Sequence, residues 1–287
     1  MTVERTADAA MADVLLTLLG DIEANLAGTL ADTDPECLHD LRVGIRRTRS
    51  LLKLTGDVLP RGLGQRYAAR FKWLGELTTP VRDLDVHLLA FDELAADVPA
   101  SHRQELEPFR EHLRRQRSMR FDELTHGLSG DRFTKLREGW REELAAAAAG
   151  SGGSAQPEVP TVGELAAERI GRAGRAVRRR ARALTPDSPS DALHDLRKRA
   201  KELRYLLETF APPHGKSARK AIKELKRVQD VLGSYQDAQV QLSAVREYAA
   251  GLDSTPAAVD ELAAALGHRQ EQARTDLGPR LSAFLSR

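Results

Sequence analysis

Basic side chains recur at helical spacing in one short segment of the chain. Steps of three or four residues separate its members, which are His39, Arg42, Arg46, Arg49 and Lys53. On an α-helix these steps keep the side chains on one face, because 3.6 residues complete a turn. Apolar residues usually occupy such a stripe, so a cationic stripe is either a face exposed to solvent or the lining of an anion site.

The same pattern returns in the second half of the chain at an offset of 155 residues. Residues 193–197 match residues 38–42 at five successive positions, with the sequence Leu-His-Asp-Leu-Arg in both places. The second stripe therefore contains His194, Arg197, Lys201 and Arg204, and its next step falls on Glu208. Two cationic stripes at matched positions favour a shared polyanion site over two unrelated solvated faces.

Further cations follow each stripe along the chain. In the second half they are Lys216, Lys220, Lys223, Lys226 and Arg227. In the first half they are Arg66, Arg70 and Lys72, with Trp73 at the position of Arg227. A preceding segment adds Arg172, Arg175, Arg179 and Arg182 to the second half, where the first half has Asp21 and Glu23. We therefore expect the second half to bind anions more strongly.

The charge distribution supports a local anion-binding surface. The whole chain has a net charge of only +2, yet residues 164–227 carry 18 basic and 8 acidic side chains, which gives +10. Arginine supplies 35 of the 44 cations. Its planar guanidinium donates two parallel hydrogen bonds to phosphate, although an arginine-rich composition explains the excess equally well.

The chain is predicted to be all-α. Ala, Leu, Arg and Glu dominate it, apolar residues recur every three or four positions, and Asp34-Pro35-Glu36 is typical of a helix start. We expect helices at about 5–31, 35–56, 64–79, 81–97, 101–126, 131–149, 161–184, 190–211, 216–233, 235–251 and 256–286.

The repeated stripes predict an internal duplication. Its halves would be residues 1–149 and 161–287, joined by a Gly/Ser/Pro linker at 150–160. Two similar all-helical halves, each with one apolar face to bury, would pack as bundles related by a pseudo-twofold axis. Thr79-Pro80 replaces Gly233-Ser234 of the second half, so we expect a less regular helix end in the first half.

Several function classes are disfavoured. The single cysteine, Cys37, excludes an intramolecular disulfide framework and fits a cytosolic protein, and no apolar run reaches the roughly 20 residues that span a bilayer. The sequence contains no phosphate-binding P-loop and no nucleophile elbow, so we expect neither catalytic residues nor a cofactor. Asp83, Asp85 and Asp237 are better explained by helix starts or ion pairs than as magnesium ligands.

The two motifs resemble those of the CHAD domain, the conserved histidine α-helical domain. The resemblance rests on His39-Asp40-Leu41-Arg42-Val43 with Arg46 and Arg49, and on His194-Asp195-Leu196-Arg197-Lys198 with Lys201, Arg204 and Tyr205. It extends from about residue 5 to 285. It implies two four-helix bundles around a basic cleft or pore, and a protein that binds inorganic polyphosphate, often at cytoplasmic polyphosphate granules.

By the same resemblance, the pore would be lined by Arg42, Arg46, Arg49, Arg197, Lys201, Arg204, Lys220 and Lys223. CHAD domains often accompany a triphosphate-tunnel catalytic domain, whose Glu-x-Glu-x-Lys strand is not found here, so the resemblance implies a stand-alone binding module.

Two other functions stay open. A nucleic-acid-binding protein would use the same cations, but aromatic residues make up only 5% of the chain, and single-strand binders stack bases on aromatic rings. A metal-dependent phosphohydrolase would need the histidines as ligands. However, His39 and Asp40 diverge by about 100° on a helix and do not easily chelate one ion, so we expect no metal site. Either histidine would then orient its neighbours or donate directly to phosphate.

Overall fold

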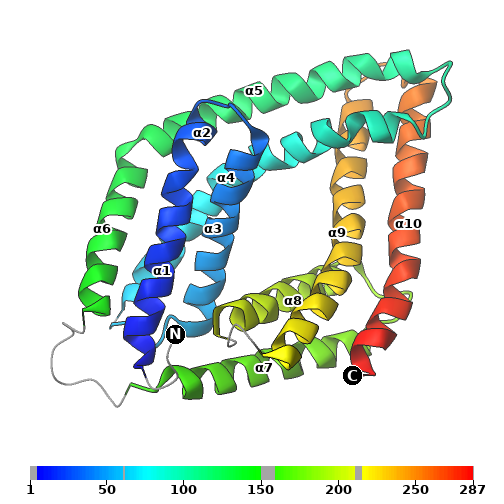
Figure 1. The fold of residues 1–287 in the computed structure, drawn as a ribbon. Coiled ribbons are helices and arrows are strands. Elements are labelled where there is room, and N and C mark those ends of the chain that lie inside the picture. The colour runs from blue at the N-terminus through cyan, green and yellow to red at the C-terminus, as the bar shows by residue number, and fades with distance from the viewer. Residues whose placement is uncertain (1–4, 61, 150–158, 211–214, 287) are drawn as a thin grey trace. The chain divides into compact units, whose positions relative to one another are not determined.

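The computed structural model describes residues 5–60, 62–149, 159–210 and 215–286, and the regular elements in these ranges are helices (Figure 1). The helices are α1 (Ala7–Ala24), α2 (Leu26–Leu30), α3 (Pro35–Thr55), α4 (Leu63–Ala95), the short 3₁₀-helix η1 (Arg103–Leu106), α5 (Glu107–Ser129), α6 (Asp131–Ala148), α7 (Val162–Ala183), α8 (Ser190–Phe210), α9 (Lys216–Ala250) and α10 (Ala257–Leu285). The predicted all-α fold class is confirmed.

The predicted start of α3 is also confirmed. Asp34 precedes the helix in an extended conformation, and its Oδ1 accepts a hydrogen bond of 2.8 Å from the backbone N–H of Glu36. Pro35 occupies the first turn, where its missing N–H has no helical partner to lose. This cap fixes where the α3 cations lie on the helix.

Two predicted helix boundaries are wrong. The segments expected at 64–79 and 81–97 form the single helix α4, and those expected at 216–233 and 235–251 form the single helix α9. A proline removes only one backbone hydrogen bond, and Leu74 and Val81 are fully buried on either side of Pro80. Packing on both sides therefore keeps the helix continuous, and the less regular helix end expected at Thr79-Pro80 does not exist.

Two shorter differences have local causes. The helix expected at 5–31 is interrupted at Asn25, which lies between α1 and α2. The helix expected from residue 101 begins as η1 and becomes α-helical at Glu107. Helix ends fray and tighten within one or two residues, so these offsets do not move the cationic stripes.

The chain divides into two compact units. Unit 1 contains Met1–Arg82, Arg120–Gly174 and Glu202–Ala218, and unit 2 contains Asp83–Met119, Arg175–Lys201 and Arg219–Arg287. Each unit thus takes residues from both halves of the sequence. The predicted repeat boundaries at 1–149 and 161–287 stay a prediction, and the predicted linker lies outside the described residues except for Val159 and Pro160.

The core of unit 1 forms where α1 packs against α3 and α6 (Figure 1). Apolar side chains at helical spacing supply it, including Leu18, Ile22, Leu38, Leu41, Ile45 and Leu52. The Trp140 ring of α6 lies against Tyr67, with ring centroids 4.4 Å apart. Burying one face of α3 in this core leaves its cationic stripe on the other side.

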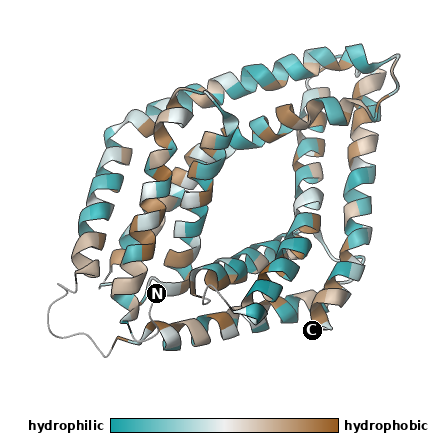
Figure 2. Ribbon diagram, viewed as in Figure 1, coloured by the Kyte–Doolittle hydropathy of each residue, from teal (hydrophilic) through white to brown (hydrophobic). Residues whose placement is uncertain are grey.

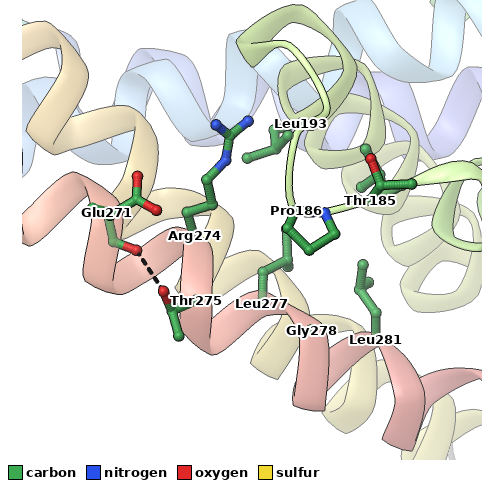
Figure 3. A pocket seen from close by; sticks show the side chains of 10 residues that line it. Thr185, Pro186, Leu193, Glu271, Arg274, Thr275, Leu277, Gly278 and Leu281 are labelled. Carbon is green, nitrogen blue, oxygen red and sulfur yellow. Dashed lines mark hydrogen bonds between the residues drawn. The ribbon is translucent and has the colours of Figure 1, made fainter.

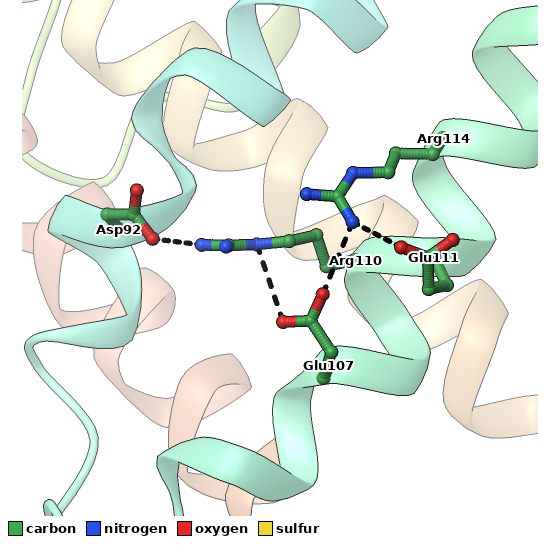
Figure 4. Close-up of polar contacts among 5 residues, drawn as sticks. All are labelled: Asp92, Glu107, Arg110, Glu111 and Arg114. Carbon is green, nitrogen blue, oxygen red and sulfur yellow. Dashed lines mark hydrogen bonds and ion pairs between the residues drawn. The ribbon is translucent and has the colours of Figure 1, made fainter.

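Unit 2 has a separate core built from α4, α5, α9 and α10. Phe109 is fully buried there, and its ring centroid lies 4.9 Å from that of Tyr248. On the surface, Arg110 and Arg114 bind the carboxylates of Asp92, Glu107 and Glu111 (Figure 4). These arginines are therefore neutralised by neighbouring acidic residues. They are not among the predicted site residues.

The helices are amphipathic rather than apolar throughout. Figure 2 shows hydrophilic residues recurring along each of them between the hydrophobic ones. Within the described ranges, no helix is both long enough and apolar enough to cross a membrane.

Candidate functional site

The cationic stripe of α3, defined here as the α3 stripe, consists of His39, Arg42, Arg46, Arg49 and Lys53, all within unit 1. The helix α4 holds the first of its arginines. Arg42 Nη1 donates hydrogen bonds of 2.9 Å to Thr78 Oγ1 and 3.0 Å to Thr79 Oγ1. A hydroxyl acceptor carries no charge, so these two bonds orient the guanidinium without cancelling its charge.

The two threonines are themselves held in place by their own helix. Thr78 Oγ1 donates to the Leu74 carbonyl at 3.0 Å, and Thr79 Oγ1 donates to the Gly75 carbonyl at 2.6 Å. Because each hydroxyl hydrogen is used in this way, the oxygen presents its lone pairs to Arg42. The turn of α4 before Pro80 is thus a fixed acceptor surface for the α3 stripe.

Arg49 lies against the same turn of α4, at Gly75. A Cβ atom on Gly75 would lie 2.5 Å from Arg49 Nη1 and 3.4 Å from its Cζ, so any other residue there would displace this guanidinium. Arg49 is exposed, and no carboxylate among the described residues forms an ion pair with it. Its charge therefore remains available to solvent or to a ligand.

Arg46 binds a tyrosine of α8 within unit 1. Its Nε donates a 2.9 Å hydrogen bond to Tyr205 Oη, and Tyr205 is buried with 2% of its surface exposed. The guanidinium carbons of Arg47 and Arg204 lie 5.7 and 5.3 Å from the centroid of the same ring. Three arginines therefore gather around one aromatic side chain.

Acidic residues of α8 pair with some of these cations. Glu208 Oε2 lies 2.7 Å from Arg47 Nη2, and its Oε1 lies 3.8 Å from Arg204 Nε. Glu202 Oε1 lies 2.6 Å from Lys53 Nζ, and the Glu202 side chain is only 6% exposed. Lys53, a predicted site residue, therefore holds a buried carboxylate. Glu208, which ends the second stripe, holds two arginines.

His39 begins the α3 stripe and is half-buried. Burial lowers the pKa of its imidazole, and the positive charges of Arg82 and Arg46 lower it further against the opposing effect of Glu36 and Asp40. Near neutral pH the ring is therefore uncharged. The structure favours a neutral imidazole at this position over an imidazolium.

The other predicted cations of the first half lie on different faces of α4. Arg66 forms an ion pair with Glu143 of α6 and lies nine residues, or two and a half turns, before Gly75. Arg70 lies over the Tyr67 ring at 4.7 Å, and Lys72 Nζ lies 3.6 Å from Glu76 Oε1. The structure therefore does not bring Arg66 and Arg70 to the face of α4 that meets the α3 stripe.

In unit 2 the second stripe meets α9. His194 is exposed, and its Nδ1 lies 3.0 Å from Gln236 Oε1. Partial desolvation raises the pKa of the Asp237 carboxyl, although the residue as a whole is solvent-exposed. The positive charges of Arg197 and Lys201 oppose this rise. Two predicted cations thus flank one carboxylate on α9.

The α9 lysines, defined here as Lys220, Lys223 and Lys226, are exposed on the side of α9 away from the buried Leu225. Among the described residues, no acidic side chain forms an ion pair with any of the three. By contrast, Arg227 Nη1 lies 2.8 Å from Glu224 Oε1. Lys216 is also exposed and belongs to unit 1.

Sequence reasoning missed the residues that hold the cations. Gly75, Thr78 and Thr79 were not predicted, because their partners lie 26 to 37 positions away along the chain. Tyr205 carries a weak signal, since it is the aromatic residue within the second motif. Its contact with Arg46, 159 residues away, is visible only in the fold.

A metal ion needs a group of ligating side chains placed around it. The described residues contain no group of three or more His, Cys, Asp or Glu side chains placed to share an ion. Asp85 instead pairs with Arg117, with 2.5 Å between Oδ1 and Nε, as its interpretation as an ion-pair residue predicts.

Two cavities of unit 2 lie apart from the predicted cations. One of about 240 Å³ is lined mainly by Leu193, Leu277, Leu281 and their neighbours, with Arg274 among the lining residues (Figure 3). Arg274 also donates a hydrogen bond to the Ser188 carbonyl. The other, of about 610 Å³, lies between α4, α9 and α10 and includes Asp237 and Gln241 in its wall. No residue of the α3 stripe or of the α9 lysines lines either cavity.

A comparison with protein-family models matches residues 13–246 to the CHAD domain. The chain belongs to the CHAD family. The match includes both histidine motifs, the α3 stripe and the α9 lysines.

Two solved structures share the fold. The CHAD domain from the plant Ricinus communis matches with a TM-score of 0.78 and 23% identity, over 99% of this chain and 94% of that one. The protein PptA from Streptomyces chartreusis matches with a TM-score of 0.72 and 16% identity, over 97% of this chain and 99% of that one. A search among curated proteins finds no match.

Proposed function

We propose that this CHAD domain binds inorganic polyphosphate without turning it over. The observation that carries the proposal is that Arg46, Arg49 and the α9 lysines form no ion pair with any carboxylate among the described residues. Most other predicted cations are held by acidic neighbours. Uncompensated cations at helical spacing fit a ligand that supplies one negative charge at each unit of its chain.

The spacing of the cations supports a flexible linear anion. Successive side chains of one helical stripe are about 5 to 6 Å apart, so one polyphosphate chain reaches several of them. Each contact releases counterions, which makes affinity fall as salt rises and makes longer chains bind more tightly. The internal duplication predicted from the repeated stripes belongs to this proposal. The basic cleft and the association with cytoplasmic granules, which the family resemblance implies, belong to it as well.

Nucleic acid is the weaker alternative. Single-strand binders expose aromatic rings on which bases stack. Tyr205 is the aromatic residue beside the α3 stripe, and it is buried beneath Arg46 with 2% of its surface exposed. Its ring is therefore not available for stacking.

Calorimetric titration with polyphosphates of defined length, at two salt concentrations, tests the proposal. We expect affinity to rise with chain length and its logarithm to fall linearly with the logarithm of the salt concentration. Displacement of long polyphosphate by DNA or RNA at equal phosphate concentration would favour the nucleic-acid function. Release of phosphate with Mg²⁺ or Mn²⁺, lost in His39→Ala, would show a phosphohydrolase instead.

A further inference from the structure

The hydroxyl of Tyr205 accepts a hydrogen bond, and its own hydrogen has no acceptor in the part of the chain that the structure describes. Its oxygen accepts from Arg46 Nε at 2.9 Å, and among the described residues no oxygen lies in position to receive the phenolic hydrogen. Two other buried tyrosines differ. Tyr67 Oη donates to Glu143 Oε1 at 3.0 Å, and Tyr235 Oη shares a 2.7 Å hydrogen bond with Ser190.

The charge around this hydroxyl is unevenly compensated. Glu208 interacts with two of the three guanidinium groups near the ring, those of Arg47 and Arg204. Arg46 has no carboxylate partner among the described residues, and it is only half-buried. The cluster therefore keeps a surplus of positive charge, and Arg46, next to the Tyr205 hydroxyl, is the arginine of the three without a carboxylate partner among the described residues.

The contact through Nε determines which part of Arg46 can meet a ligand. With Nε–H committed to Tyr205, both terminal amino groups of the guanidinium keep their hydrogens for other acceptors. Nε–H and one N–H of the neighbouring amino group point the same way and form a fork, in which Tyr205 occupies the Nε side and a phosphate oxygen can accept on the other side. An oxygen in that position would lie next to the Tyr205 hydroxyl, which could donate its own hydrogen to it.

We propose that Arg46 and Tyr205 bind one phosphate unit together. Tyr205 acts first as a positioning residue, which orients Arg46 through Nε, and then as a neutral donor of its own hydrogen to the same phosphate. This inference rests on the proposed polyphosphate function. It adds an uncharged residue, Tyr205, to a site that is otherwise defined by its cations.

Tyr205→Phe tests the pair, because it removes only the hydroxyl group. We expect affinity for a long polyphosphate to fall about tenfold, a change of about 1.4 kcal/mol, because the variant loses one hydrogen bond to a charged group. The slope of log affinity against log salt should not change, because no cation is lost. Arg46→Gln should instead reduce that slope by roughly 0.7 to 0.9.

A double-mutant cycle separates the pair from a general effect on the fold. In the Arg46→Gln background, Tyr205→Phe should cost little further affinity, because the two residues act as one unit. Tyr67→Phe is the matched control, since its hydroxyl already has an acceptor, and it should leave affinity unchanged. Thermal melting of each variant verifies that it is folded.

Distinct results overturn the inference and the function. If the unaltered protein fails to bind polyphosphate, the proposed function is wrong. If it binds and Tyr205→Phe binds equally well, or if the loss is the same without Arg46, only the pair is wrong. Should Tyr205→Phe not fold, Arg46→Lys carries the test. It keeps the charge but loses the Nε contact and the fork, so it should lower affinity at an unchanged salt slope.

Discussion

The α3 stripe and the α9 lysines both carry positive charge at helical spacing, but they present it differently. Neutral groups hold the α3 arginines in place, namely two threonine hydroxyls, a glycine surface and a tyrosine hydroxyl. The α9 lysines are exposed and have no ion-pair partner in the described part of the chain. The first arrangement suits a fixed contact, and the second suits attraction of a mobile polyanion.

The difference has a thermodynamic meaning. A guanidinium already fixed by the fold loses little side-chain freedom when it binds phosphate, whereas a flexible lysine loses up to about 2 kcal/mol of rotamer entropy. Exposed lysines still raise the local potential and the rate of encounter. We therefore expect the α9 lysines to dominate the salt dependence and the α3 stripe to dominate the geometry of binding.

The largest expected effect comes from charge reversal. Lys220→Glu with Lys223→Glu should lower affinity for long polyphosphate by roughly 10- to 100-fold at low salt, because two uncompensated cations become anions. Arg66→Glu with Arg70→Glu is the matched control and should cost less than about threefold, since Arg66 already pairs with Glu143. Calorimetry measures both. If the Arg66 and Arg70 reversals lowered affinity more than the Lys220 and Lys223 reversals, the second half would not be the stronger anion-binding half.

Lys53→Met should affect stability more than binding. The substitution removes the 2.6 Å ion pair with the buried Glu202 carboxylate, so the free energy of unfolding should fall by about 1 to 3 kcal/mol. Lys223→Met, in the α9 lysines, should change it by less than about 0.5 kcal/mol. Urea denaturation measures both values, and equal values would show that Lys53 is not anchored as described.

Gly75→Ala should separate stability from affinity. Alanine stabilises a helix by about 0.5 to 1 kcal/mol relative to glycine, while its Cβ would displace the Arg49 guanidinium from α4. We expect a slightly higher melting temperature and roughly threefold weaker binding. Gly20→Ala in α1, where no atom lies within 4 Å, should raise stability alone. Unchanged binding in Gly75→Ala would mean that the position of Arg49 does not matter.

The smallest expected effect concerns pH. The lowered pKa of His39 keeps its imidazole neutral at pH 7, so affinity should change by less than about twofold between pH 8 and pH 7. Because the unfolded chain takes up this proton first, the contribution of His39 to stability is complete above about pH 6.5 and decreases below it. Titrations at constant ionic strength check the affinity. A steep rise in affinity from pH 8 to pH 7 that is abolished in His39→Gln would contradict a neutral His39 imidazole.

The sequence predicts the helices and the stripes because both depend on local spacing. Asp34 as a cap and Leu38, Leu41 and Ile45 as buried residues require no knowledge of distant contacts. The continuity of α4 through Pro80 is different. There the burial of Leu74 and Val81 outweighs a local signal for a break, and burial depends on the whole unit.

The anchoring of the cations was beyond prediction for the same reason. Lys53 and Lys223 look alike in the sequence, and one holds a buried glutamate while the other has no ion-pair partner among the described residues. Tyr205 and Thr78 could not be linked to the α3 stripe, because the pattern of spacing stops at the end of each helix.

The interleaving of the two units limits how the chain can be dissected. Half of the unit 2 core, including Phe91 and Phe109, precedes the predicted linker, and the other half, including Val245 and Leu262, follows it. A fragment cut at the linker would therefore expose a large apolar surface. Separately expressed halves should remain insoluble alone and recover a native far-ultraviolet spectrum only when they are refolded together.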